Sequence, residues 1–98
     1  MSSNLFVSYD LHEPGKNYEA VAAAIKQLSG VWAKVHYSLW YVRSNMFASQ
    51  AAERIWRSMD ASDSLIVIDV TNNDAYWYNL TPDVSKHLQQ NWRAQLAA

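Results

Sequence analysis

The chain has no cysteine and only two glycines and two prolines among its 98 residues. The lack of cysteine excludes a disulfide framework, a thiolate metal site and a thiol nucleophile. With only Gly15 and Gly30, the chain has no glycine-rich loop to hold phosphates, and no glycines flank a serine as in a nucleophile elbow. These absences argue against an ATPase, a dinucleotide enzyme or a hydrolase of the nucleophile-elbow type.

Charge of either sign is also scarce. Only 17% of residues are charged, and 8 Lys and Arg against 9 Asp and Glu give a formal net charge of −1. Such a chain has no general positive field to attract polyanions, so charge does not favour nucleic acid as a partner. No apolar run approaches the ~18 residues of a membrane span, and the N-terminal sequence lacks the pattern of a signal peptide. We therefore expect a cytoplasmic protein without a membrane partner.

Hydrophobic residues make up half of the chain and aromatic residues 13%. This length and composition predict one folded domain over residues 1–98, with its core in about residues 4–70 and a C-terminal tail over 71–98.

Apolar periodicity predicts strands at residues 5–10, 31–42 and 64–70, the second of them broken near Tyr37 and Ser38. Helical spacing predicts one helix from Tyr18 to Leu28, and another that is capped by Ser49 and runs to about residue 59. Residues 75–80 fit either a short edge strand or an aromatic loop, and residues 81–83 open a final helix. The order predicts an α+β, ferredoxin-like βαββαβ sandwich with an extra C-terminal helix.

The strand at residues 64–70 is apolar on both faces, with Leu65 and Val67 on one and Ile66 and Ile68 on the other. With both helices on one face of the sheet, the other face needs a cover. Either the C-terminal helix or a second copy can supply it, and for so short a chain we favour a two-fold homodimer.

The order of these segments, with Tyr9-Asp10 closing the first strand and Val35-His36-Tyr37-Ser38-Leu39-Trp40 in the second, resembles the small CRISPR-associated endoribonuclease family and the related virulence-associated protein D toxins. It is most similar to the small bacterial proteins called SinR-like. The resemblance covers roughly the first seventy residues. It implies a dimer in which Asp10 of each subunit holds a divalent ion, Mg²⁺ or Mn²⁺, near the axis, and it aligns Ser38 with a serine of the family's second strand. The cluster of basic residues expected after the first strand is reduced here to Lys16.

Asp10 is the strongest candidate for catalysis and metal binding, because a two-fold axis can bring two carboxylates together as oxygen ligands. Alternatively, Asp10 only ends its strand and accepts loop hydrogen bonds. Asp69 provides a second carboxylate if the strands at residues 5–10 and 64–70 are neighbours in the sheet. His12 and Glu13 follow Asp10 and are either a general base and ligand or a solvated loop.

Aromatic residues gather in residues 32–41, where Lys34 and Arg43 accompany Tyr37, Ser38 and Trp40. Such a surface can stack nucleic-acid bases or form a protein interface, and without a positive field we favour a homodimer seam.

Two functions follow from these patterns. The first is a catalytically silent homodimer that acts as an interaction or regulatory module. The alternative is a metal-dependent endonuclease for RNA or DNA that uses paired Asp10 residues. A weaker third possibility is a small-ligand sensor with a pocket between sheet and tail.

Overall fold

A five-stranded antiparallel sheet and three helices form an α+β fold in the computed structural model, which describes residues 2–12 and 18–97. The elements follow in the order β1 (Ser3–Asp10), α1 (Tyr18–Lys26), β2 (Val31–His36), β3 (Leu39–Ser44), α2 (Ala48–Trp56), β4 (Ser64–Asp69), β5 (Asp74–Tyr78) and α3 (Pro82–Ala97). The strands lie side by side in the order β2-β3-β1-β4-β5, and every neighbouring pair is antiparallel.

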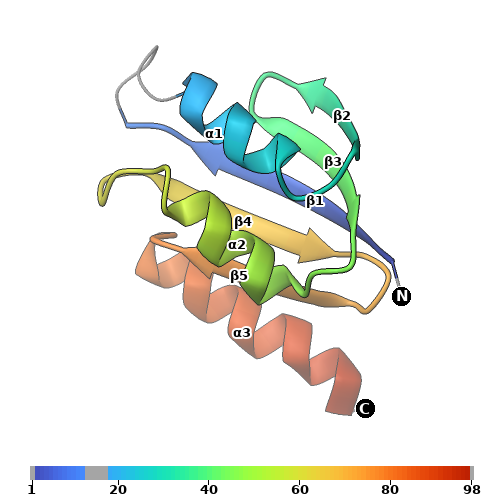
Figure 1. Cartoon of the computed structure of the whole chain (residues 1–98). Helices are drawn as coiled ribbons and strands as arrows, with labels where there is room; N and C mark the ends of the chain where they lie inside the picture. The colour runs from blue at the N-terminus through green and yellow to red at the C-terminus, as the bar shows by residue number, and fades with distance from the viewer. Residues whose placement is uncertain (1, 13–17, 98) are drawn as a thin grey trace.

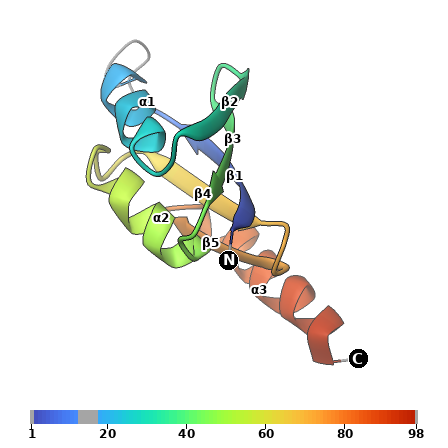
Figure 2. The same cartoon turned by 45° about the vertical axis from the view of Figure 1, so that its right-hand side comes forward.

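Helices α1 and α2 lie side by side on one face of the sheet, as Figures 1 and 2 show. Helix α3 begins beside β5 on the opposite face and projects away from the sheet towards the C-terminus, as Figure 2 shows most clearly. The sequence therefore predicted the first two helices, the break between β2 and β3, and the helix that opens at Pro82, because strong periodicity and local stop or capping signals mark each of them.

The fold differs from the predicted six-element sandwich by one strand. Residues predicted to form a tail contain β5, which pairs with β4 from Leu65 opposite Tyr78 to Asp69 opposite Asp74. The connecting turn places Asn73 in the left-handed region with a φ of 53°, a conformation that asparagine tolerates better than most residues. The sheet thus has five strands and does not follow the plain βαββαβ order.

The β4–β5 turn is organised by Asp69, whose side chain is 1% exposed. One carboxylate oxygen accepts the backbone N–H groups of Thr71 and Asn72, each at 3.0 Å, and the other accepts the Asn72 side-chain amide at 2.7 Å. That amide also donates to the hydroxyl of Ser3 at 3.0 Å. Asp69 is therefore a structural residue that fixes the turn to the start of β1.

Helix α2 begins two residues earlier than predicted, at Ala48. Its N-cap is Phe47, whose backbone N–H donates to the Gln50 side chain at 2.9 Å, so Ser49 lies inside the first turn and is exposed. The side chain of Gln50, at the third helical position, therefore caps the N-terminus of α2 in place of a serine hydroxyl.

The two faces of the sheet differ in burial. On the face covered by α1 and α2, which we call the helix face, alternate residues of the inner strands are fully buried together with residues of both helices: Leu5, Val7, Val42, Leu65 and Val67 from the sheet, and Val21, Ile25 and Ile55 from the helices. This is the hydrophobic core.

The opposite face, which we call the outer face, carries Phe6, Leu39, Tyr41, Ile66, Ile68 and Trp77. All six residues are only half-buried. Helix α3 covers the β5 end, where the Trp77 indole N–H donates to Ser85 at 2.9 Å. The remainder of this apolar face has no helix over it among the described residues.

Candidate functional site

Asp10 lies at the C-terminal end of β1, opposite Ser64 of β4, and is exposed. It falls on the outer face, because it alternates with the buried Tyr9 and continues the row of Phe6 and Ser8. No described residue hydrogen-bonds to its carboxylate. Within the described part of the chain, Asp10 therefore has no hydrogen-bond partner for its side chain and lies at the rim of the outer face.

Asp69 cannot assist Asp10 within one chain. The antiparallel register places Asp69 opposite Leu5, at the other end of β1, while Asp10 lies opposite Ser64. The two carboxylates therefore cannot share an ion within one subunit, and that hypothesis is wrong. The sequences of the two strands do not show that the strands are antiparallel.

The carboxylate of Asp63 fixes the segment that follows Asp10 through hydrogen bonds. Asp63 is 3% exposed and accepts the backbone N–H groups of His12 and Asp60, each at 2.8 Å. His12 itself is exposed, and Glu13 lies outside the described residues. No group of three His, Asp or Glu side chains within residues 2–12 and 18–92 is placed to hold a metal ion.

Most of the aromatic residues around β2 and β3 form a cluster on the helix face, which we call the aromatic corner: Tyr9, Tyr18, Trp32, Tyr37 and Trp40. Ring centroids lie 4.6 Å apart for Tyr18 and Tyr37 and 5.5 Å apart for Trp32 and Trp40. The Trp40 indole N–H donates to the Tyr9 hydroxyl at 3.0 Å. Trp40 is buried, whereas Trp32 and Tyr37 are 40% and 61% exposed.

Two lysines lie over these rings. The Nζ of Lys26, from α1, is 4.8 Å from the Trp32 ring centroid, and the Nζ of Lys34 is 4.8 Å from that of Tyr37. Both ammonium groups also lie within 6 Å of the Trp40 centroid. Sequence analysis missed Lys26, because it comes from a different element and no spacing connects it to β2.

The residues predicted as an interface do not share one surface. Lys34, Tyr37 and Trp40 belong to the aromatic corner, while Arg43 is exposed on the outer face opposite Asn4. The backbone carbonyl of Ser38 accepts the Tyr9 N–H at 3.2 Å in the connection between β2 and β3. A single aromatic seam over residues 32–41 is therefore not present; instead, Tyr41 packs against Phe6 on the outer face, with ring centroids 5.6 Å apart.

Burial raises the pKa of the Tyr9 hydroxyl, and the hydrogen bond from Trp40 offsets part of that increase. Because the pKa is higher in the folded state, the hydroxyl of Tyr9 loses its proton first in unfolded chains. The contribution of the protonated hydroxyl to folding stability is therefore complete below a pH of about 10, and it is lost as the pH rises through the folded-state pKa. We expect the free energy of unfolding, measured by urea denaturation, to fall as the pH rises above about 10, and to fall less in Tyr9→Phe. An equal fall in both proteins would contradict this role for Tyr9.

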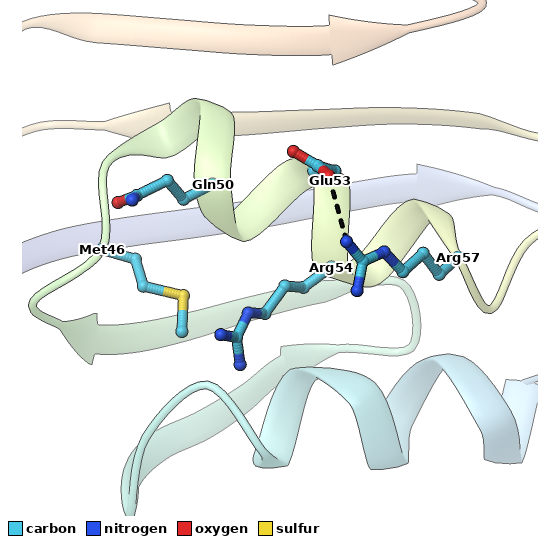
Figure 3. A pocket seen from close by; sticks show the side chains of 5 residues that line it. All are labelled: Met46, Gln50, Glu53, Arg54 and Arg57. Atoms are coloured by element: carbon cyan, nitrogen blue, oxygen red, sulfur yellow. Dashed lines mark hydrogen bonds and ion pairs between the residues drawn. The ribbon is translucent and has the colours of Figure 1, made fainter.

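A small pocket of about 210 Å³ lies beside α2 and is lined by Met46, Gln50, Glu53, Arg54 and Arg57 (Figure 3). Arg57 donates to the Glu53 carboxylate at 3.0 Å, so these two opposite charges are paired. Glu53 and Arg57 are well exposed, so this pair contributes little to stability. Among the lining residues only Glu53 is of a type that acts as a general base, and its carboxylate is paired with Arg57.

A pocket of about 310 Å³ lies between β5 and α3 and is lined by Ala75, Tyr76, Trp77 and Gln89. Beside it is a space of about 10 Å³, lined mainly by Asp74, Leu88 and Trp92, which holds at most about one water molecule. None of the described helices is both long and apolar enough to cross a membrane.

Comparison of the chain with protein-family models, with curated proteins and with solved structures finds no match.

Proposed function

We propose that this chain is a homodimeric interaction module that is catalytically silent, pairs through its outer face and works in the cytoplasm. The observation that carries this proposal is the contrast within β4. Leu65 and Val67 are fully buried against the helices, whereas Ile66 and Ile68 on the outer face are only partly buried in the single chain. A contiguous apolar surface of this kind is typical of a protein–protein interface.

The outer face has the composition of an interface. Its centre is apolar and aromatic, with Phe6, Tyr41 and Ile68 on three adjacent strands. Polar and charged residues lie at its ends, Asn4 and Arg43 at one and Asp10 with Ser64 at the other. Interfaces between proteins commonly combine an apolar centre with a polar rim.

The ferredoxin-like assignment belongs to the same proposal. The first six elements have the order β1-α1-β2-β3-α2-β4, their strands lie in the order β2-β3-β1-β4, and both helices lie on one face. This arrangement supports a split βαβ sandwich to which β5 and α3 are added. It also agrees with the resemblance to the CRISPR-associated endoribonucleases and SinR-like proteins, which implies a dimer with Asp10 of each subunit near its axis.

Sedimentation equilibrium at tens of micromolar tests the self-association. We expect a mass of twice the 11.2 kDa chain, falling towards the single-chain mass on dilution. A single-chain mass at every concentration would contradict the proposal.

The second candidate is a metal-dependent endonuclease acting on RNA or DNA, and the exposed carboxylate of Asp10 is the observation that favours it. A two-fold axis near the C-terminal end of β1 would bring two such carboxylates together. Their repulsion would favour either a shared proton or a bound Mg²⁺ or Mn²⁺. That ion could polarise the phosphate and activate water for cleavage.

We expect the chain to leave labelled RNA and DNA intact in the presence of Mn²⁺, and Asp10→Ala to leave this result and the dimer unchanged. Denaturing gel electrophoresis of the substrates, with Ser8→Ala as the matched control, provides the measurement. Manganese-dependent cleavage by the parent and by Ser8→Ala, reduced at least about a hundredfold in Asp10→Ala, would instead establish the nuclease.

A further inference from the structure

Strand β2 is an open edge of the sheet. All six of its residues are exposed, whereas its neighbour β3 alternates between buried residues and residues that are half-buried or exposed. Val31 and Trp32 are 50% and 40% exposed, which is high for large apolar side chains in a strand. No described segment pairs with the outer side of β2. Such an edge presents unpaired backbone N–H and C=O groups and can bind a further strand.

Positive charge accompanies this edge on the helix face. Trp32 and Lys34 point to that face because they lie opposite Val42 and Trp40 of β3, and Lys26 of α1 lies over the Trp32 ring. Neither lysine forms an ion pair with any described residue. Cation–π contacts hold both ammonium groups beside the open edge, where the charge stays available.

Two of the three β2 residues that are paired on the outer face are aliphatic, and the third, His36, lies opposite Leu39 at the end of the strand. Val31 and Ala33 lie opposite Arg43 and Tyr41 on the outer face, and no charged side chain of β2 stands between them. A strand added to β2 would therefore meet lysines and an exposed indole on one side and aliphatic groups on the other. Because side chains alternate along a strand, this asymmetry selects an alternating pattern in the incoming segment.

We propose that the β2 edge binds an extended segment of a partner protein in which acidic and aliphatic residues alternate. Backbone hydrogen bonds to β2 would supply affinity, and carboxylates facing Lys26 and Lys34 would supply selectivity. A second copy of this chain is a poorer occupant, because pairing β2 with β2 would bring two lysine-bearing edges together. This site differs from the outer face, so the chain can dimerise and bind such a segment at the same time.

Fluorescence anisotropy with a short labelled peptide of alternating valine and glutamate tests this site. We expect saturable binding that weakens with added salt, and about tenfold weaker binding to Lys34→Glu, since attraction is replaced by repulsion. Lys86→Glu, which changes the same charge on exposed α3, is the matched control and is expected to bind within about twofold of the parent. A peptide with lysine in place of glutamate, and one with a central proline, are expected not to bind.

Several results would overturn the site: no binding of the glutamate peptide, equal binding of the lysine peptide, or equal binding by Lys34→Glu. The peptide site would also be overturned if the Lys34→Glu variant differed from the parent in its oligomeric mass. In that case β2 would be an interface between copies of this chain. The outer-face variant Ile66→Glu separates this proposal from the dimer. If it becomes a monomer yet binds the peptide as the parent does, the two surfaces act independently.

Discussion

Replacing Ile66 by glutamate is expected to convert the dimer to a monomer. Ile66 lies in the apolar centre of the outer face, opposite Ser8 on one side and Trp77 on the other. A two-fold interface would bury two new carboxylates among apolar side chains without partners. We expect the dissociation constant, measured by sedimentation equilibrium, to rise at least about a hundredfold, or about 3 kcal/mol.

The control for this experiment is Phe47→Glu. Phe47 is the most exposed of the large hydrophobic residues at 67%, and it begins α2 on the other side of the sheet. We expect this variant to remain dimeric, with circular dichroism showing that both variants are folded. If Ile66→Glu associates as strongly as the parent, the outer face is not the interface.

The two adjacent substitutions Leu65→Ala and Ile66→Ala are expected to differ widely in their effect on the stability of the monomer. Leu65 is fully buried in the core beneath the helices, so its truncation leaves a cavity and costs about 3 kcal/mol. Ile66 is only partly buried in the single chain, so its truncation costs less, about 1 kcal/mol.

Urea denaturation at concentrations where the chain is monomeric provides the comparison. At concentrations where the dimer forms, Ile66→Ala is expected to lose more apparent stability, because dimerisation is coupled to folding. Equal losses for the two variants in the monomer would mean that the chain buries its own outer face. In that case, the outer face would not need a second copy of the chain to cover it, and the main argument for the dimer would fail.

Local patterns predicted the elements that carry strong periodicity. Alternation in β1, with Leu5, Val7 and Tyr9 buried, and the apolar run of β4 identified both strands of the sheet's interior. The Thr81-Pro82-Asp83 opening predicted α3, whose Ser85 N–H donates to the Thr81 carbonyl at 2.9 Å. These features depend on neighbours in the sequence and could be predicted without the fold.

Features that depend on strand pairing could not be predicted in the same way. Residues 74–78 are rich in aromatic side chains that suit either a loop or a strand, and only pairing with β4 decides between them. The aromatic residues at 32–41 predict a single seam, but the register places Trp40 in the core and Tyr41 on the outer face. A displacement by one residue would exchange these faces, which is why the sequence alone did not assign them.

Isotope-filtered NMR on a sample mixed from isotope-labelled and unlabelled chains tests the outer-face dimer most directly. It detects only contacts between protons of different chains. We expect intermolecular contacts to the methyl groups of Ile66 and Ile68 and to the ring of Phe6, and none to the buried Leu65. Intermolecular contacts confined to β2, or none at concentrations of hundreds of micromolar, would contradict a dimer built on the outer face.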